Sequence, residues 1–165
     1  YCPYPAYMGN RWRAFSPGRA VDELQALSQD HGVNAIWFRD QTFTFQEDRT
    51  RMICEEILAR GLDIRWICET RADRLNESLV AEMGRAGCVR VQIGVETGDP
   101  GLLGSVGKVG CDIEVIERAF RMLREHGIKT TAFLMVGFPG ESWRSVRASR
   151  DLVRRGIQEG VVDDG

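Results

Sequence analysis

The stretch VRVQIGVETG, residues 89–98, combines a buried strand with a polar, glycine-containing end. Successive side chains of a strand point to opposite faces, so the apolar residues at 91, 93 and 95 share one face. The other face then carries Gln92, Gly94 and Glu96. A sheet face that is covered by helices needs apolar residues, and burying unpaired polar groups is costly. The second face therefore points toward an interior that holds something polar.

The same kind of strand recurs along the chain, each time after a helical pattern that ends in glycine. We expect helices at 21–31, 48–60, 76–86 and 113–126, strands at 35–38, 64–70, 89–95 and 129–136, and a last helix at about 142–155. This alternation predicts parallel strands joined by right-handed crossovers. An open doubly wound sheet and part of a (β/α) barrel both have this pattern, and both place chemistry at the carboxyl ends of the strands.

The strand at 64–70 sends further polar side chains into that interior, because its alternation turns Glu69 and Arg71 inward. Gly94 leaves room there for an occupant that lies against the backbone. Position alone leaves three other interpretations open. Glu96 and Arg71 could form a structural ion pair, the glycines and proline of 137–140 could be only a turn, and Asp40 could only cap the turn that follows it.

The expected helix at 48–60 has Asp48 as its capping residue. Its apolar stripe consists of Met52, Ile53, Ile57 and Leu58. The glycine-rich loop at 101–110 lacks the spacing of a phosphate-binding loop, so we interpret it as a flexible loop with Lys108 at its tip, able to cover a ligand.

Composition narrows the class of protein. The 165 residues include 22 basic and 24 acidic side chains, a net charge of -2, and the charges are well mixed. This distribution gives no nucleic-acid signal. The longest apolar stretches are far shorter than the roughly 20 residues of a membrane span. We expect one globular domain that is soluble and cytoplasmic.

Five cysteines, at positions 2, 54, 68, 88 and 111, form no CxxC pair. An odd number without such pairs argues against a disulfide framework and against a zinc knuckle. Cys54, Cys68 and Cys88 lie in apolar segments, where free cysteine behaves as a small core residue. Cys2 differs, because it lies between Tyr1 and Pro3 in a loop context.

With these residues in view, the chain resembles the core of radical S-adenosylmethionine (radical SAM) enzymes. It is most similar to the branch that usually carries an N-terminal cobalamin-binding domain. The matching stretches are YCPYP (1–5), RAFSPGRAVDEL (13–24), AIWFRDQTFTF (35–45), WICETRAD (66–73), MGRAGCVRVQIGVETG (83–98) and FLMVGFPGES (133–142). The resemblance implies an α/β fold, a partial (β/α)6 TIM-like barrel of parallel strands truncated at both ends. Residues 1–165 then form part of one core domain that lacks the first strand, two cluster cysteines and the last strand.

The resemblance also implies the cofactors. In that family a CxxxCxxC loop binds a 4Fe-4S cluster, and Cys2 matches its third cysteine, a metal ligand. S-adenosylmethionine fills the open iron site and is cleaved reductively to a 5'-deoxyadenosyl radical. A reductant protein such as flavodoxin or ferredoxin is the implied partner. Cobalamin is a further implied cofactor of the full-length protein.

Matching positions in the family assign the cofactor-binding side chains. Asp40 meets the methionine amino group, Arg71 meets the methionine carboxylate, and Glu96 meets the ribose hydroxyls or the amino group. Residues 133–139 supply apolar and backbone contacts to adenine, chiefly through Val136, Gly137 and Pro139. No catalytic residue and no substrate can be assigned from the sequence.

Two other functions remain open. One is an ordinary barrel enzyme of acid/base chemistry, with Asp40, Glu69 and Glu96 as its working carboxylates and Cys2 incidental. The other is a binding module without chemistry. The residues that precede Tyr1 separate these functions, because a CxxxCx segment ending there supports the radical enzyme.

Overall fold

The computed structural model describes residues 6–7, 9, 11–108 and 110–165. Its sheet has four parallel strands, β1 (Ala35–Trp37), β2 (Arg65–Thr70), β3 (Cys88–Glu96) and β4 (Lys129–Leu134), in the order β1-β2-β3-β4. Each strand therefore pairs with the strand before it in the chain. A doubly wound sheet reverses this order once, whereas a barrel does not. Of the two predicted architectures, the structure has that of a (β/α) barrel segment.

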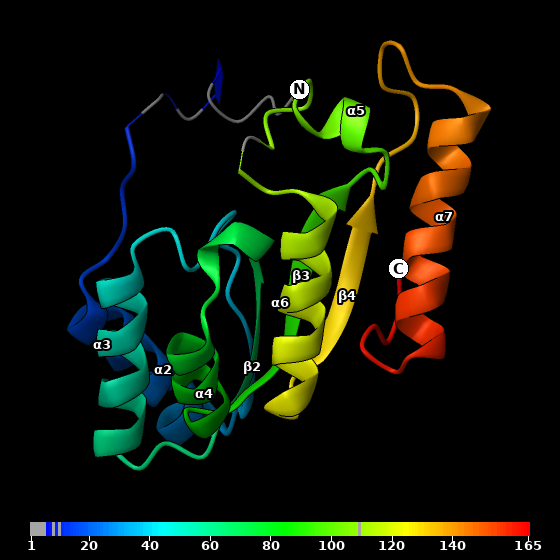
Figure 1. The fold of residues 1–165 in the computed structure, drawn as a ribbon. Helices are drawn as coiled ribbons and strands as arrows, with labels where there is room; N and C mark the ends of the chain where they lie inside the picture. Colours follow the sequence, from blue (N-terminus) through cyan, green and yellow to red (C-terminus); the bar gives the residue numbers. More distant parts are fainter. Residues whose placement is uncertain (1–5, 8, 10, 109) are drawn as a thin grey trace.

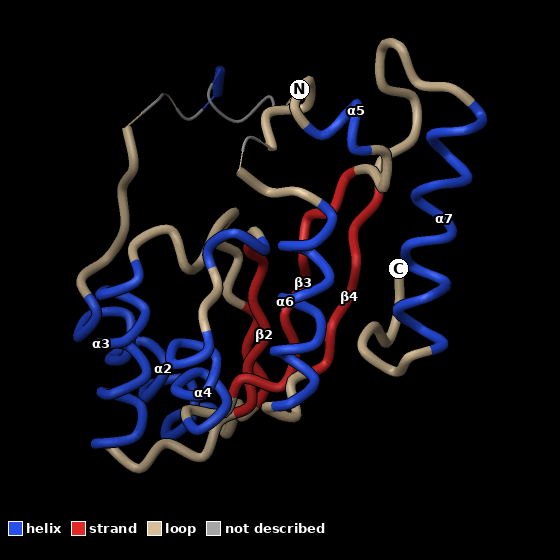
Figure 2. Tube along the Cα trace, viewed as in Figure 1, coloured by secondary structure: helices blue, strands red, loops and turns tan. Residues whose placement is uncertain are grey.

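The helices connect and cover the strands. They are α2 (Pro17–His31), α3 (Glu47–Ala59), α4 (Glu77–Arg85), the short α5 (Pro100–Leu103), α6 (Ile113–Glu125) and α7 (Trp143–Gln158), with a 3-10 turn η1 (Ala72–Arg74) after β2. Figure 1 shows α4 and α6 in front of the sheet, and α7 beside β4. Figure 2 shows β3 and β4 continuing into loops at the same end of the sheet. The predicted order of elements is confirmed.

Side-chain caps fix where most of these helices begin. In each case a side-chain oxygen accepts a hydrogen bond from a backbone N–H of the first turn, which satisfies a donor that the helix leaves unpaired. The capping residues are Ser16, Asn76, Asp112 and Ser142. Helix α2 starts at Pro17, four positions before the predicted start, because proline is favoured at the first helical position.

Helix α3 differs from its prediction in two ways. Its N-cap is Gln46, which makes no side-chain capping bond, so Asp48 is not the cap but lies in the first turn. Met52 and Leu58 are exposed, and the buried face consists of Thr50, Ile53, Cys54 and Ile57. The predicted 3.6-residue period of α3 is correct, but its buried face is rotated from the predicted one. Small Thr and Cys side chains pack where the helix approaches its neighbours.

The core lies between the sheet and the helices. Val91, Ile93 and Val95 of β3 are fully buried, as the alternation predicted. Trp66 of β2 is fully buried as well, and its indole N–H donates a 2.7 Å hydrogen bond to the carbonyl of Ala86. A buried indole needs such a partner. The helix-facing side of the sheet is therefore a closed apolar core.

The cysteines of the described chain belong to this core. Cys54, Cys68, Cys88 and Cys111 are all buried and free, so the prediction that the first three pack as core residues is confirmed. Cys2, the predicted cluster ligand, lies outside the described residues.

The last residues of the chain add to the far edge of the sheet. Ala132 donates a 2.8 Å hydrogen bond to the carbonyl of Asp164, and Asp163 donates one of 2.9 Å to the carbonyl of Thr130. Thr131 and Asp164 thereby form a parallel bridge. Among the described residues, no helix has the length and apolar character that crossing a membrane requires.

Candidate functional site

Because all four strands are parallel, the polar segments that follow them meet at one edge of the sheet. Asp40 follows β1, Arg71 follows β2, Glu96 ends β3, and residues 135–139 follow β4. These positions include the predicted cofactor-binding residues. The structure therefore brings the predicted site to the carboxyl ends of the strands, where barrel chemistry resides.

Glu96 and Lys108 form the centre of this edge. Glu96 is buried and adopts a left-handed backbone conformation with φ 67°, which is uncommon for a non-glycine residue. Its Oε1 lies 3.3 Å from the Nζ of Lys108, which is also buried. Lys108 donates a further hydrogen bond of 2.6 Å to the carbonyl of Gly94. Strained backbone of this kind persists only where the surroundings hold it.

Gly94 makes this pair possible. A Cβ at this position would lie 2.6 Å from Glu96 Oε1 and 3.1 Å from Lys108 Nζ, so the ends of both side chains would have to shift. The sequence predicted that Gly94 leaves space for an occupant. In the structure that space holds the Glu96–Lys108 ion pair.

Arg71 points to a different partner. Its guanidinium binds both carboxylate oxygens of Asp73, at 2.8 and 3.1 Å, and it also reaches the carbonyl of Gly107 at 3.3 Å. Burial raises the pKa of Asp73, but the hydrogen bonds and charge of Arg71 lower that pKa by more. The alternative ion pair between Glu96 and Arg71 is wrong, because each of the two has another partner.

The end of β1 carries two further ion pairs. Asp40 lies 3.8 Å from Arg49, and Glu69 lies 3.1 Å from Arg39, whose guanidinium is 4.0 Å from the centroid of the Trp37 ring. Each carboxylate that was considered for acid/base work thus has a cation beside it. The geometry therefore offers no unpaired carboxylate among these three.

In the loop after β4, a backbone hydrogen bond fixes the conformation, and several side chains are exposed. Gly137 has φ 105°, a conformation that favours glycine, and its N–H donates a 2.6 Å hydrogen bond to Glu141 Oε2. Val136 is 72% exposed, and Pro139 is exposed as well. Such a segment can offer apolar side chains and backbone groups to a flat, uncharged ligand surface.

Lys108 differs from its prediction. The sequence predicts it at the tip of a flexible loop, but the loop contains α5 and is anchored by buried Leu103 and Val106. This anchoring turns Lys108 inward. Lysine is rare in this chain, which has only Lys108 and Lys129 among its 22 basic residues, and that rarity was the available signal.

The inner face of the sheet has the chemistry for a polar ligand. In register, Glu69, Gln92 and Thr131 form a row across β2, β3 and β4. Within the described part of the chain, the Oε1 atom of Gln92 is buried and has no hydrogen-bond partner. Buried polar atoms are normally satisfied, so this acceptor fits a bound donor group. Within 6–7, 9, 11–108 and 110–165, no three His, Cys, Asp or Glu residues are placed to hold a metal ion.

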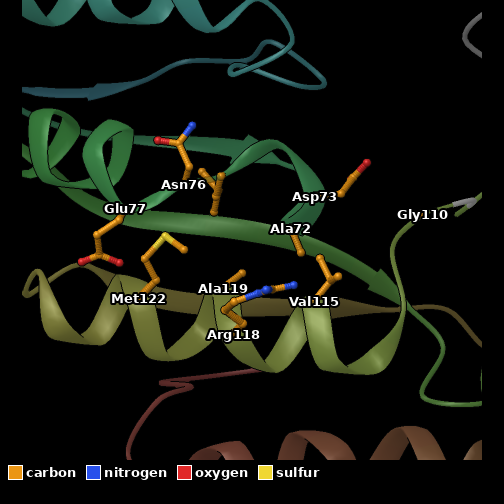
Figure 3. Close-up of a pocket in the computed structure, with 10 residues that line it drawn as sticks. Ala72, Asp73, Asn76, Glu77, Gly110, Val115, Arg118, Ala119 and Met122 are labelled. Carbon is orange, nitrogen blue, oxygen red and sulfur yellow. The ribbon is translucent and has the colours of Figure 1, made fainter.

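A cavity of about 340 Å³ lies apart from this edge, on the helical side of the sheet. Figure 3 shows it between the segment from Ala72 to Glu77 and helix α6, with Arg118, Ala119 and Met122 below. None of the predicted cofactor-binding residues lines it. Its connection to the site is Asp73, which lines the cavity and binds Arg71.

The chain belongs to the radical SAM superfamily, a family of enzymes. The family model described as the Radical SAM superfamily matches residues 1–153. An uncharacterized methyltransferase of Pyrococcus horikoshii is 32% identical over 155 residues, which cover 94% of this chain and 34% of that protein. The anaerobic magnesium-protoporphyrin IX monomethyl ester cyclase of Rubrivivax gelatinosus is 27% identical, over 93% of this chain and 29% of that protein. The chain thus spans about a third of the length of these relatives.

A solved structure shows the same fold. The radical S-adenosylmethionine methyltransferase TsrM from Kitasatospora setae, solved with cobalamin and a [4Fe-4S] cluster bound, matches with a TM-score of 0.76 and 24% identity. The match covers 93% of this chain and 28% of that one. The predicted partial TIM-like barrel of the radical SAM fold is therefore confirmed.

Proposed function

We propose that this chain is the part of a radical SAM enzyme core that binds S-adenosylmethionine and contributes Cys2 to a 4Fe-4S cluster. The observation that supports this function most is the polar edge built by Gly94, Glu96 and Lys108 at the end of β3 of a radical SAM barrel. Residues 1–165 then form part of a single core domain. When bound, the reduced cluster supplies the electron that cleaves S-adenosylmethionine to a 5'-deoxyadenosyl radical.

In this proposal, each residue at the strand ends binds a different group of S-adenosylmethionine. Asp40 accepts a hydrogen bond from the methionine amino group, and Arg71 binds the methionine carboxylate. Glu96 accepts hydrogen bonds from the ribose hydroxyls or the amino group. For Arg71 to do this, its guanidinium keeps its two hydrogen bonds to Asp73 and turns Nη1 from the carbonyl of Gly107 toward the ligand.

The adenine ring is the group that suits the loop after β4. Val136 and Pro139 are exposed, and Gly137 leaves its backbone accessible because it carries no side chain. Contacts of this kind recognise a flat apolar ring through packing and backbone hydrogen bonds. Gln92, with its unpartnered Oε1, faces the same interior and would accept a hydrogen bond from a bound donor group.

The whole protein is proposed to be a cobalamin-dependent methyltransferase. Support comes from the methyltransferase of Pyrococcus horikoshii and from the TsrM structure with bound cobalamin. A low-potential reductant protein, such as flavodoxin or ferredoxin, is its proposed electron donor. A cytoplasmic location goes with this proposal, because reduced thiols and reductant proteins are found there.

Anaerobic reconstitution of the full-length protein tests the function. Iron and sulfide should give a 4Fe-4S cluster, and dithionite with S-adenosylmethionine should then give 5'-deoxyadenosine. Cys2→Ala should remove the cluster. Cys111→Ala, which changes a buried free thiol, should keep it. A full cluster in Cys2→Ala would contradict the proposal.

Acid/base chemistry is the competing function that the same experiment addresses. The ion pairs of Asp40, Glu69 and Glu96 weaken it, since none of these carboxylates stands free of a cation. It would regain support if turnover of a substrate persisted in protein prepared without iron.

A further inference from the structure

A second surface of the chain combines exposed aromatic rings with arginines. The rings of Trp12 and Phe45 are 6.0 Å apart, Arg49 lies 6.0 Å from the Trp12 ring, and Arg74 lies 5.7 Å from the Phe45 ring. Arg49 also donates a 3.1 Å hydrogen bond to the carbonyl of Phe15. Arg19 lies 4.5 Å from the Phe15 ring. We call this connected set the aromatic–arginine patch, and its members are Trp12, Phe15, Arg19, Phe45, Arg49 and Arg74.

The rings of the patch are open to solvent. Trp12 is 43% exposed, Phe15 is 56% exposed and Phe45 is 46% exposed. Single exposed apolar residues are ordinary, but a contiguous group of three large rings marks an interaction surface. Aromatic residues and arginine are also the types enriched in the centres of protein interfaces. An arginine lies within 6.0 Å of each ring, and such contacts restrict the rings and lower the entropy that a partner must overcome.

The charge of the patch selects the kind of partner. Residues 11–19 contain three arginines and no acidic residue, within a chain whose net charge is -2. The patch is thus a local positive region on a slightly acidic protein. The Arg19–Glu23 ion pair is exposed and long, at 3.8 Å, so solvent screens it and leaves the charge of Arg19 available to a partner. Arg74 is exposed, with its guanidinium 5.7 Å from the Phe45 ring. These features complement an acidic surface.

The patch borders the strand-end site. Phe45 lies in the loop that leads from β1 to α3, and Arg74 lies in η1, directly after β2. Arg49 connects the two regions because it stacks near Trp12 and approaches the Asp40 carboxylate. A protein docked on the patch therefore sits beside the edge at which the proposed cofactors bind.

We propose that the aromatic–arginine patch docks the acidic electron-donor protein of this enzyme. The proposal rests on the proposed function, because only an enzyme with a redox cluster needs such a donor. In the step that docking serves, the donor loses one electron and the cluster gains it. For a flavodoxin, the anionic hydroquinone becomes the neutral semiquinone, so charge and protons balance.

Charge reversal tests this inference on the reconstituted full-length protein. The variant Arg19→Glu/Arg74→Glu changes two exposed members of the patch and no residue of the site. Its matched control is Arg118→Glu/Arg150→Glu, which changes two exposed arginines on helices α6 and α7. Titration calorimetry with flavodoxin should show about a tenfold loss of affinity for the patch variant and less than about a twofold loss for the control. Raising the salt concentration from about 50 to about 300 mM should weaken the binding of flavodoxin to wild type and reduce the difference in affinity between wild type and the patch variant.

A comparison of two reductants, dithionite and flavodoxin hydroquinone, tests the docking inference separately from the proposed function. With dithionite, the patch variant should form 5'-deoxyadenosine as fast as wild type, whereas with flavodoxin hydroquinone it should be about tenfold slower at low donor concentration. Equal rates with flavodoxin would overturn the docking inference and leave the function standing. No 5'-deoxyadenosine from wild type with dithionite would contradict the function.

A nucleic acid is the other partner that rings and arginines can bind. A single-stranded RNA of about 20 nucleotides serves as its probe. If the RNA binds the patch more tightly than flavodoxin does, and the double charge reversal abolishes that binding, the electron-donor inference is overturned. Absence of RNA binding, together with the loss of flavodoxin affinity, supports it.

Discussion

The ammonium of Lys108 lies 3.3 Å from the carboxylate of Glu96 and binds the carbonyl of Gly94 two residues earlier. One buried cation therefore holds both the side chain of Glu96 and the backbone that leads into it. Because the backbone of Glu96 is left-handed, the carboxylate depends on this contact for its direction. The loop at 101–108 is thus a structural part of the site.

Lys108→Met should destabilise the fold by about 3 kcal/mol, because removing one partner of a buried ion pair leaves the other charge uncompensated. Lys129→Met is the natural control, since Lys129 is exposed at the start of β4 and should change stability by less than about 0.5 kcal/mol. Urea unfolding followed by circular dichroism measures both. Equal midpoints for the two variants would show that the pair contributes nothing.

Gly94→Ala should displace the pair, since the new Cβ would lie 2.6 Å from Glu96 Oε1. We expect a loss of about 1–3 kcal/mol, as for other overpacked sites, together with weaker binding of S-adenosylmethionine. Gly104→Ala provides the comparison, because Gly104 has a right-handed conformation and no atom within 4 Å of the added carbon. Calorimetry of unfolding and ligand titration report the two effects, and a Gly94→Ala protein as stable as Gly104→Ala would refute the steric argument.

Asp73 should make stability depend on pH. Burial raises its pKa, but the hydrogen bonds and charge of Arg71 lower it further, so the net pKa is below the ordinary 3.8. The folded state then holds the carboxylate form more strongly than the unfolded state does. This contribution is complete above the ordinary pKa and is lost as the pH falls through the lowered one.

The Asp73→Asn variant isolates that contribution. Its unfolding free energy should lie below that of wild type at pH 7, and the gap should narrow as the pH drops below the ordinary pKa of 3.8. Asp30→Asn, on the exposed side of α2, is the matched control for the substitution itself. A gap that is constant with pH would contradict the role of Arg71.

The core thiols should resist modification. Burial raises the pKa of Cys54 to about 12, and burial likewise raises the pKa of Cys68 well above its ordinary value. Only the thiolate reacts, so neither should be labelled by an aromatic disulfide reagent at pH 8 in the folded protein. Mass spectrometry after labelling in urea, where both should react, supplies the comparison. Rapid labelling without denaturant would indicate that the core opens.

The order of elements could be predicted because the sequence carries it locally. Each helix has a 3.6-residue apolar period and a glycine or a capping residue at its ends, and β3 alternates strictly. The inward direction of Gln92 and Glu96 followed from that alternation alone. The choice between an open sheet and a barrel could not be predicted in this way. It depends on the strand order, which no local sequence pattern contains.

The contacts of the site could not be predicted for the same reason. The partner of Glu96 is Lys108, twelve residues away, and the loop between them reaches it only because Leu103 and Val106 are buried. The sequence alone suggests Arg71 as the partner of Glu96, since Arg71 is predicted on the same polar face of the sheet. The buried face of α3 was also misjudged, because Thr50 and Cys54 were less conspicuous than Met52 and Leu58.

The strand order affects how the protein can fold during its synthesis. Since β1, β2, β3 and β4 are neighbours in the sheet in the order in which they leave the ribosome, each new strand finds its template already present. No strand has to wait for one that lies further along the chain, because each pairs with the strand that precedes it. The site is assembled in the same sequence, with Asp40 placed first, then Arg71, then Glu96, and finally the loop at 135–139.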